Sequence, residues 1–176
     1  MTIVRPRYAR IDHLTNTLLI ESGISAPPVP VDQIIRARGI AIQTTSLGEI
    51  SGLVIRKGKE IVIGVNKDHP PNRRRFTMAH EMAHALLHHG NEVHYDKDFR
   101  INLRSEESGL GVHVEEIEAN FFAACLLMPR RFLDADPAAA LVDAENADAV
   151  ANVAKRYGVS THAMSIRLGN IAIRRY

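Results

Sequence analysis

The sequence predicts an α+β fold in which a small three-stranded, mostly antiparallel sheet packs on helices. Apolar residues recur with the period of a helix over several long segments, whereas β-branched runs are confined to residues 40–66. The 176 residues are 45% hydrophobic but only 5% aromatic, which indicates a globular chain with a mostly aliphatic core. We therefore expect one domain over residues 1–176, with its core at about 40–130 and a C-terminal helical segment at about 145–176.

The N-terminal part is predicted to contain two helices and three strands. Ile11, Leu14 and Leu18 recur at helical spacing, and Gly23 ends that pattern. Lys57-Gly58 separates two β-branched runs, so these two runs are expected to form a hairpin. The predicted helices span residues 8–22 and 31–38, and the predicted strands span residues 40–44, 53–55 and 61–63.

The rest of the chain is predicted to be mainly helical. One long periodic segment has Gly90 just past its end, and Pro129 ends a second. The polar connection between them contains at most one short strand, near residues 99–103. The predicted helices span residues 72–89, 113–128, 148–157 and 161–168, with a turn and a short helical piece over residues 130–141. The last two helices, joined by Gly158-Val159-Ser160, are typical of a helix-turn-helix.

Composition excludes several classes of protein. The formal net charge is only +2, which by itself does not indicate a nucleic-acid partner. No apolar stretch approaches the ~18 residues of a membrane-spanning helix, and the first ten residues do not have the pattern of a secretory signal. Cys125 is the only cysteine, so an internal disulfide is impossible and a reducing cytoplasm is the expected location.

The segment His80-Glu81-Met82-Ala83-His84 is an H-E-x-x-H motif within the predicted helix 72–89. Residues four apart lie on one face of a helix, so the two imidazoles can bind one zinc ion. Glu81 can reach a metal-bound water without being a ligand itself. A histidine-rich solvated helix is the alternative. The apolar periodicity supports the helix, and its place after a strand and before a second long helix favours a metal-binding, zincin-type active-site helix.

Catalytic zinc usually has three protein ligands, so a third ligand is needed. The predicted helix 113–128 offers His113 and three glutamates. Glu116 and Asn120 lie about 40° apart on one face of that helix, whereas Glu118 is turned about 200° away from Glu116. Cys125 also lies on the opposite side and is interpreted as a small core residue. Geometry alone leaves both Glu116 and His113 as candidates for the third ligand.

The second helix continues from Glu116-Ile117-Glu118-Ala119-Asn120 through F-F-A-A-C-L-L-M to Pro129. Together with the H-E-x-x-H motif, this segment resembles the ImmA/IrrE family of metallopeptidases over roughly residues 30–170. The resemblance implies that Glu116 is the third zinc ligand. It also implies that Asn120 braces a zinc-bound histidine, as the corresponding residue does in gluzincins.

A zinc-dependent metalloendopeptidase is the function that this resemblance implies. Glu81 would act as general base on a zinc-bound water, with His80, His84 and Glu116 as ligands. Mn²⁺ or Fe²⁺ would also suit these donors. His88, one turn beyond His84, is interpreted either as a metal or substrate contact or as a capping histidine that contacts a ligand. The residue that stabilises the oxyanion stays open among four candidates, which are Tyr157, His113, His88 and His162.

The family resemblance also implies a protein substrate, namely a helix-turn-helix transcriptional repressor or an antitoxin, with a role in stress or mobile-element responses. The strand over residues 59–65 is a candidate for pairing with an extended substrate. No membrane partner is expected, and the sequence does not indicate an oligomeric state.

Charge is sorted near the C-terminus. Residues 134–148 contain five acids and no base, whereas residues 151–176 contain five bases and no acid. This leaves an alternative function, that of a DNA-binding or protein-binding regulator with a structural or vestigial zinc site. In that case Arg167 would contact DNA from the helix 161–168. We favour the interpretation in which these helices pack beside the peptidase core.

Overall fold

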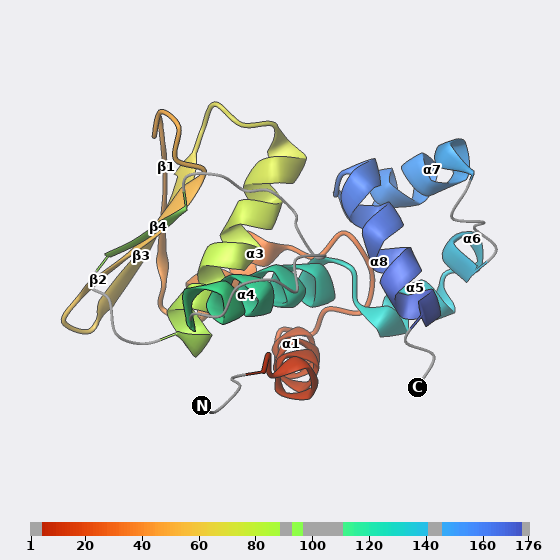
Figure 1. The fold of residues 1–176 in the computed structure, drawn as a ribbon, viewed down its shortest axis with the longest axis horizontal. Helices are drawn as coiled ribbons and strands as arrows, with labels where there is room; N and C mark the ends of the chain where they lie inside the picture. The colour runs from red at the N-terminus through yellow and green to blue at the C-terminus, as the bar shows by residue number, and fades with distance from the viewer. Residues whose placement is uncertain (1–4, 89–92, 97–110, 141–145, 174–176) are drawn as a thin grey trace.

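The computed structural model describes residues 5–88, 93–96, 111–140 and 146–173, which form eight helices and four strands (Figure 1). The helices are α1 (Tyr8–Glu21), α2 (Val31–Ala37), α3 (Pro71–Leu87), α4 (Gly111–Leu127), α5 (Arg130–Ala135), α6 (Pro137–Ala140), α7 (Ala147–Tyr157) and α8 (Thr161–Ile173). The strands are β1 (Ala41–Thr45), β2 (Gly52–Lys57), β3 (Glu60–Asn66) and β4 (Val93–Asp96).

The sheet is mixed and has the strand order β1-β3-β2-β4. β2 and β3 form the predicted antiparallel hairpin, whose turn contains Gly58 at a φ of 61°. β1 lies on the far side of β3 and runs parallel to it, and β4 pairs antiparallel with β2. The prediction of three mostly antiparallel strands is therefore wrong in strand number and in the direction of β1. Propensity alone does not tell which hairpin strand β1 joins, and pairing with β3 makes it parallel.

Two further differences concern single elements. β4 was not predicted, because Val93-His94-Tyr95-Asp96 is short and mostly polar, and the predicted strand near residues 99–103 lies outside the described residues. α8 continues to Ile173, five residues past its predicted end at 168, because Gly169 does not interrupt the helix. The other long helices begin and end within two residues of their predicted bounds, as is usual for helix termini.

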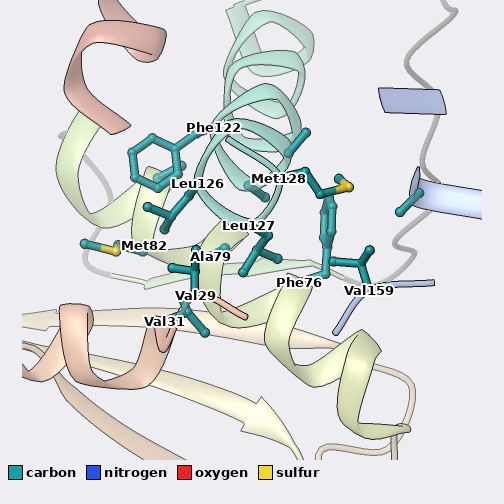
Figure 2. Close-up of a cluster of buried hydrophobic side chains, with 14 of the residues drawn as sticks. Val29, Val31, Phe76, Ala79, Met82, Phe122, Leu126, Leu127, Met128 and Val159 are labelled. Carbon is teal, nitrogen blue, oxygen red and sulfur yellow. The ribbon is translucent and has the colours of Figure 1, made fainter. Parts of the chain in front are cut away.

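The sheet and three of the helices form layers. α3 packs on β2 and β3, α4 packs on α3, and α1 packs on α4 (Figure 1). Figure 2 shows the aliphatic side chains between α3 and α4, among them Ala79, Met82, Leu126 and Leu127. All four are fully buried. Each fully buried leucine or methionine contributes about 1.5–3 kcal/mol, so this contact holds the two helices in a defined register. That register decides which polar residues of α3 and α4 face each other.

The C-terminal helices α7 and α8 are joined to the core by two arginines, half-buried Arg75 and buried Arg167. Arg75 of α3 donates hydrogen bonds to the carbonyl oxygens of Val29, at 2.8 Å, and Gly158, at 3.1 Å. Arg167 of α8 donates to the carbonyl oxygen of Met128 at 3.1 Å. The pair α7–α8 therefore packs against the core. Within the described part of the chain, no helix combines the length and apolarity needed to cross a bilayer.

Candidate metal centre

His80, Glu81 and His84 all lie on α3 and are almost completely buried. Pro71 occupies the first turn of this helix, where its missing N–H costs nothing. The four-residue spacing places the two imidazoles one above the other, and their Nε2 atoms lie 3.1 Å apart. Both Nε2 atoms therefore point to one place beside the helix.

Glu116 of α4 meets the two histidines at that place. One carboxylate oxygen lies 3.3 Å from Nε2 of His80 and the other lies 3.2 Å from Nε2 of His84. The three residues offer ligand atoms within 4.8 Å of one another, a spacing that suits a single ion. The Glu116 side chain is 32% exposed, so solvent reaches its carboxylate although both histidines are buried. The backbone of His113 lies in the first turn of α4, and its side chain is outside the described residues.

The charges of these groups suit a divalent cation. Burial lowers the pKa of His84 to about 4, although the Glu116 carboxylate opposes this shift. For Glu116, burial would raise the pKa, but hydrogen bonds with His80, His84 and His94 outweigh burial and hold it well below its usual range. A neutral imidazole and an ionised carboxylate are the forms that ligate zinc. The donor set, two nitrogens and a carboxylate, thus fits the metal that the family resemblance implies.

The second nitrogen of each histidine is also engaged. Nδ1 of His80 lies 3.2 Å from Oδ1 of Asn120, the residue expected to brace a ligand. Nδ1 of His84 lies 3.0 Å from Nδ1 of His88, which caps the C-terminus of α3. His88 contacts Glu118 with its other nitrogen, at 3.0 Å. His88 and Asn120 are therefore placed to orient the two imidazoles from behind.

Glu81 is fully buried under the first residue of β2. A Cβ added to Gly52 would lie 2.8 Å from Oε1 of Glu81 and 2.4 Å from Cγ2 of Thr77. These distances are shorter than any normal contact, so only glycine lets β2 pass this close to α3. The sheet thereby fixes the space in which the Glu81 carboxylate lies.

His94 of β4 is a residue at this centre that sequence reasoning missed. Its Nε2 lies 3.4 Å from Oε1 of Glu116, and its ring stacks on that of His84 with 3.8 Å between centroids. The register pairs His94 with Val54 of β2, which turns its side chain toward α3. No motif spacing connects residue 94 to the helix motif, and only strand pairing brings it here.

A profile of the Peptidase M78 family, described as the IrrE N-terminal-like domain, matches residues 35–169. The chain belongs to the IrrE-like M78 peptidase family. This agrees with the resemblance seen in the two helices, and it shows that the chain belongs to a family of metallopeptidases.

Two known proteins show how far this M78 relationship extends. The chain is 40% identical over 74 residues to the radiation response metalloprotease IrrE of Deinococcus deserti, which covers 42% of this chain and 24% of that protein. A solved Mycobacterium tuberculosis transcriptional regulator has a similar fold, with a TM-score of 0.54 and 17% identity over 89% of this chain and 45% of the other. The chain thus spans less than half the length of either protein.

Two of the candidates for oxyanion stabilisation, and two residues considered for other roles, lie in other elements. Tyr157 and His162 are on α7 and α8, and Tyr157 is fully buried. Burial, with the Asp136 carboxylate, raises the pKa of Tyr157 to about 12. Cys125 is buried in α4, as expected for a core residue. Arg167 is 7% exposed and bonds to a backbone carbonyl, which disfavours a role in contacting DNA.

The strand predicted to pair with an extended substrate has no free edge. β3, which contains residues 60–66, has β1 on one side and β2 on the other, so neither of its edges is free. The edge strands of the described sheet are β1 and β4. Of these two strands, β4 carries His94 and lies next to the metal centre.

Proposed function

We propose that this chain is a zinc-dependent endopeptidase that cleaves a helix-turn-helix repressor or an antitoxin. The observation that carries the proposal is the convergence of His80, His84 and Glu116, with donor atoms 3.1–3.3 Å apart. Glu81 is buried on the same helix. Membership of a metallopeptidase family supports the reaction type.

In this proposal His80 and His84 bind the ion through Nε2, and Glu116 binds it through its carboxylate. Zinc held by these residues would supply a Lewis acid for the peptide carbonyl and would lower the pKa of water at the site toward ~7. Glu81 takes up the proton of the attacking water and later passes it to the nitrogen of the leaving amine. Gly52 lets the strand close over Glu81, which keeps bulk water away from that carboxylate.

β4 is the strand proposed to bind the substrate. An extended peptide can add to a sheet edge through main-chain hydrogen bonds, and β4 is the edge strand beside the metal centre. His94 then faces the reacting peptide bond from this strand. Its position 3.4 Å from the Glu116 carboxylate suits a donor to the carbonyl oxygen, which gains negative charge in the transition state.

The substrate class rests on the family resemblance. The similar Deinococcus protein is a radiation response metalloprotease, and this supports a role in a stress response. No described feature favours DNA binding by α7–α8, since Arg75 and Arg167 hold these helices to the core.

The proposal is tested by incubating the zinc-loaded protein with the repressor or antitoxin encoded beside it, with and without a chelator. We expect cleavage that the chelator abolishes. Glu81→Gln should lower turnover by about 10²–10⁴-fold, because the proton acceptor is lost. Glu60→Gln, an exposed glutamate of β3, is the control and should cleave normally. Undiminished cleavage by Glu81→Gln would contradict the assigned role.

A further inference from the structure

We propose that Arg7 and Glu118 are positioning residues for the metal centre, because they fix the orientation and tautomer of His84 through His88. The inference rests on the proposed function in one respect, namely that His84 is a metal ligand. It adds that the N-terminal segment helps to retain the metal. Arg7 of that segment contacts Glu118, which lies 111 residues further along the chain.

Glu118 is 1% exposed, and each of its two carboxylate oxygens has two hydrogen-bonding partner atoms. Oε1 accepts from the backbone N–H of Arg7 at 2.7 Å and from its Nε at 2.9 Å. Oε2 accepts from Nη2 of Arg7 at 2.5 Å and lies 3.0 Å from Nε2 of His88. A buried carboxylate with this many partners has one orientation available to it.

The direction of each hydrogen bond follows from metal binding at His84. If Nε2 of His84 holds the ion, its Nδ1 carries the hydrogen and donates to Nδ1 of His88. Nδ1 of His88 must then be an acceptor, so the hydrogen of its ring is on Nε2. That N–H points to Oε2 of Glu118, an obligate acceptor while Arg7 holds it as a carboxylate. Each hydrogen bond that links Arg7, Glu118, His88 and His84 in this series thus joins one donor to one acceptor.

The series also joins the metal centre to the start of α1. Arg7 is the N-cap residue of that helix, and its backbone N–H bonds to the Glu118 carboxylate. Arg7 lies outside residues 35–169, the part matched by the family profile. Because linkage is reciprocal, metal binding should stabilise the docking of the N-terminal segment as much as docking stabilises the bound metal.

The test measures zinc affinity by competition with a chromophoric chelator, below the unfolding temperature of each metal-free variant. Glu118→Gln places amide N–H groups against donors and should weaken zinc binding about tenfold. Arg7→Met keeps the backbone bond but removes the guanidinium, so a smaller loss of several-fold is expected. If Glu118→Gln does not fold, the zinc affinity of Arg7→Met alone tests whether the series supports metal binding.

Arg38→Met is the matched control, since Arg38 forms an exposed ion pair with Glu21 at the other end of α1. It should bind zinc as wild type does. Long-range ¹H–¹⁵N NMR of the histidine rings adds a readout that a purely structural role would not affect. In the zinc-loaded wild type, His88 should carry its hydrogen on Nε2, and Glu118→Gln should disturb that signal.

Two results would overturn the inference while leaving the proposed function intact. One is zinc affinity within twofold of wild type in Arg7→Met and, where it folds, in Glu118→Gln. The other is a wild-type His88 with its hydrogen on Nδ1. A wild-type protein that binds no zinc would instead overturn the proposed function, and the inference would fail with it.

Discussion

At the scale of single residues, the metal centre depends on the side chains that meet there and on the absence of a side chain at Gly52. The four-residue spacing of His80 and His84 is readable from the sequence, because helix geometry converts it directly into a shared face. The place of Glu116 followed only from the family resemblance, since His113 competed with it on geometry alone. The contact of Glu118 with Arg7 could not be predicted, because no local rule relates residues 111 apart.

Gly52→Ala is expected to impair the centre without touching a proposed ligand. The new methyl group would overlap Thr77 Cγ2 and Glu81 Oε1, and relief of such overpacking typically costs about 1–3 kcal/mol. Thermal unfolding should show lower stability, and peptide cleavage should fall because Glu81 is displaced. Gly64→Ala in β3 is the control, since its Cβ would meet only the movable Leu53 side chain, at 3.0 Å. Equal effects of the two substitutions would contradict the role given to Gly52.

At the scale of elements, helices were more predictable than strands. α3 and α4 have 17 residues each. In α3 the apolar positions repeat often enough to define a face, and in α4 the run from Phe121 to Leu127 is almost wholly apolar, which is typical of a buried helix. β4 has four residues and its pattern repeats at most twice, which is too little to distinguish it from a polar loop. The strand that brings His94 to the centre was therefore the element least visible in the sequence.

His94→Ala tests whether β4 contributes to the reaction. If His94 donates to the carbonyl oxygen of the substrate, turnover should fall about 100-fold or more while the zinc content stays the same. Turnover and metal content are measured on the same preparation. Val93→Ala changes an exposed neighbour on the same strand and should have little effect. Loss of zinc from His94→Ala would show that His94 is a ligand instead, and unchanged turnover would exclude both roles.

At the scale of the whole molecule, the C-terminal helices belong to the packed structure. Charge sorting and the helix-turn-helix pattern left DNA binding by this segment as the alternative to packing against the core. The sequence could not show that Arg75 reaches the carbonyl of Gly158. Tyr157, at the end of α7, is fully buried, and its backbone carbonyl accepts a hydrogen bond from Arg75 of α3 at 3.5 Å. Its ionisation therefore reports on whether the segment stays packed.

Stability should fall in alkali through Tyr157. Burial and the Asp136 carboxylate raise its pKa from 10.0 to about 12, so the folded chain keeps a proton that the unfolded chain loses. The contribution is fully present below pH 10 and is lost as the pH rises toward 12. Tyr157→Phe should flatten the decline in unfolding free energy over this interval, as measured by urea denaturation. The same decline in wild type and variant would mean that Tyr157 is not held in its buried position.

The central claim is that His80, His84 and Glu116 hold one metal ion on which Glu81 acts without binding it. Its most direct test is the zinc content of purified wild type, Glu116→Gln and Glu81→Gln, measured by mass spectrometry after dialysis against a weak chelator. We predict one zinc per chain in wild type and in Glu81→Gln, and a large loss in Glu116→Gln. Zinc retained in full by Glu116→Gln, or lost equally from Glu81→Gln, would contradict the account.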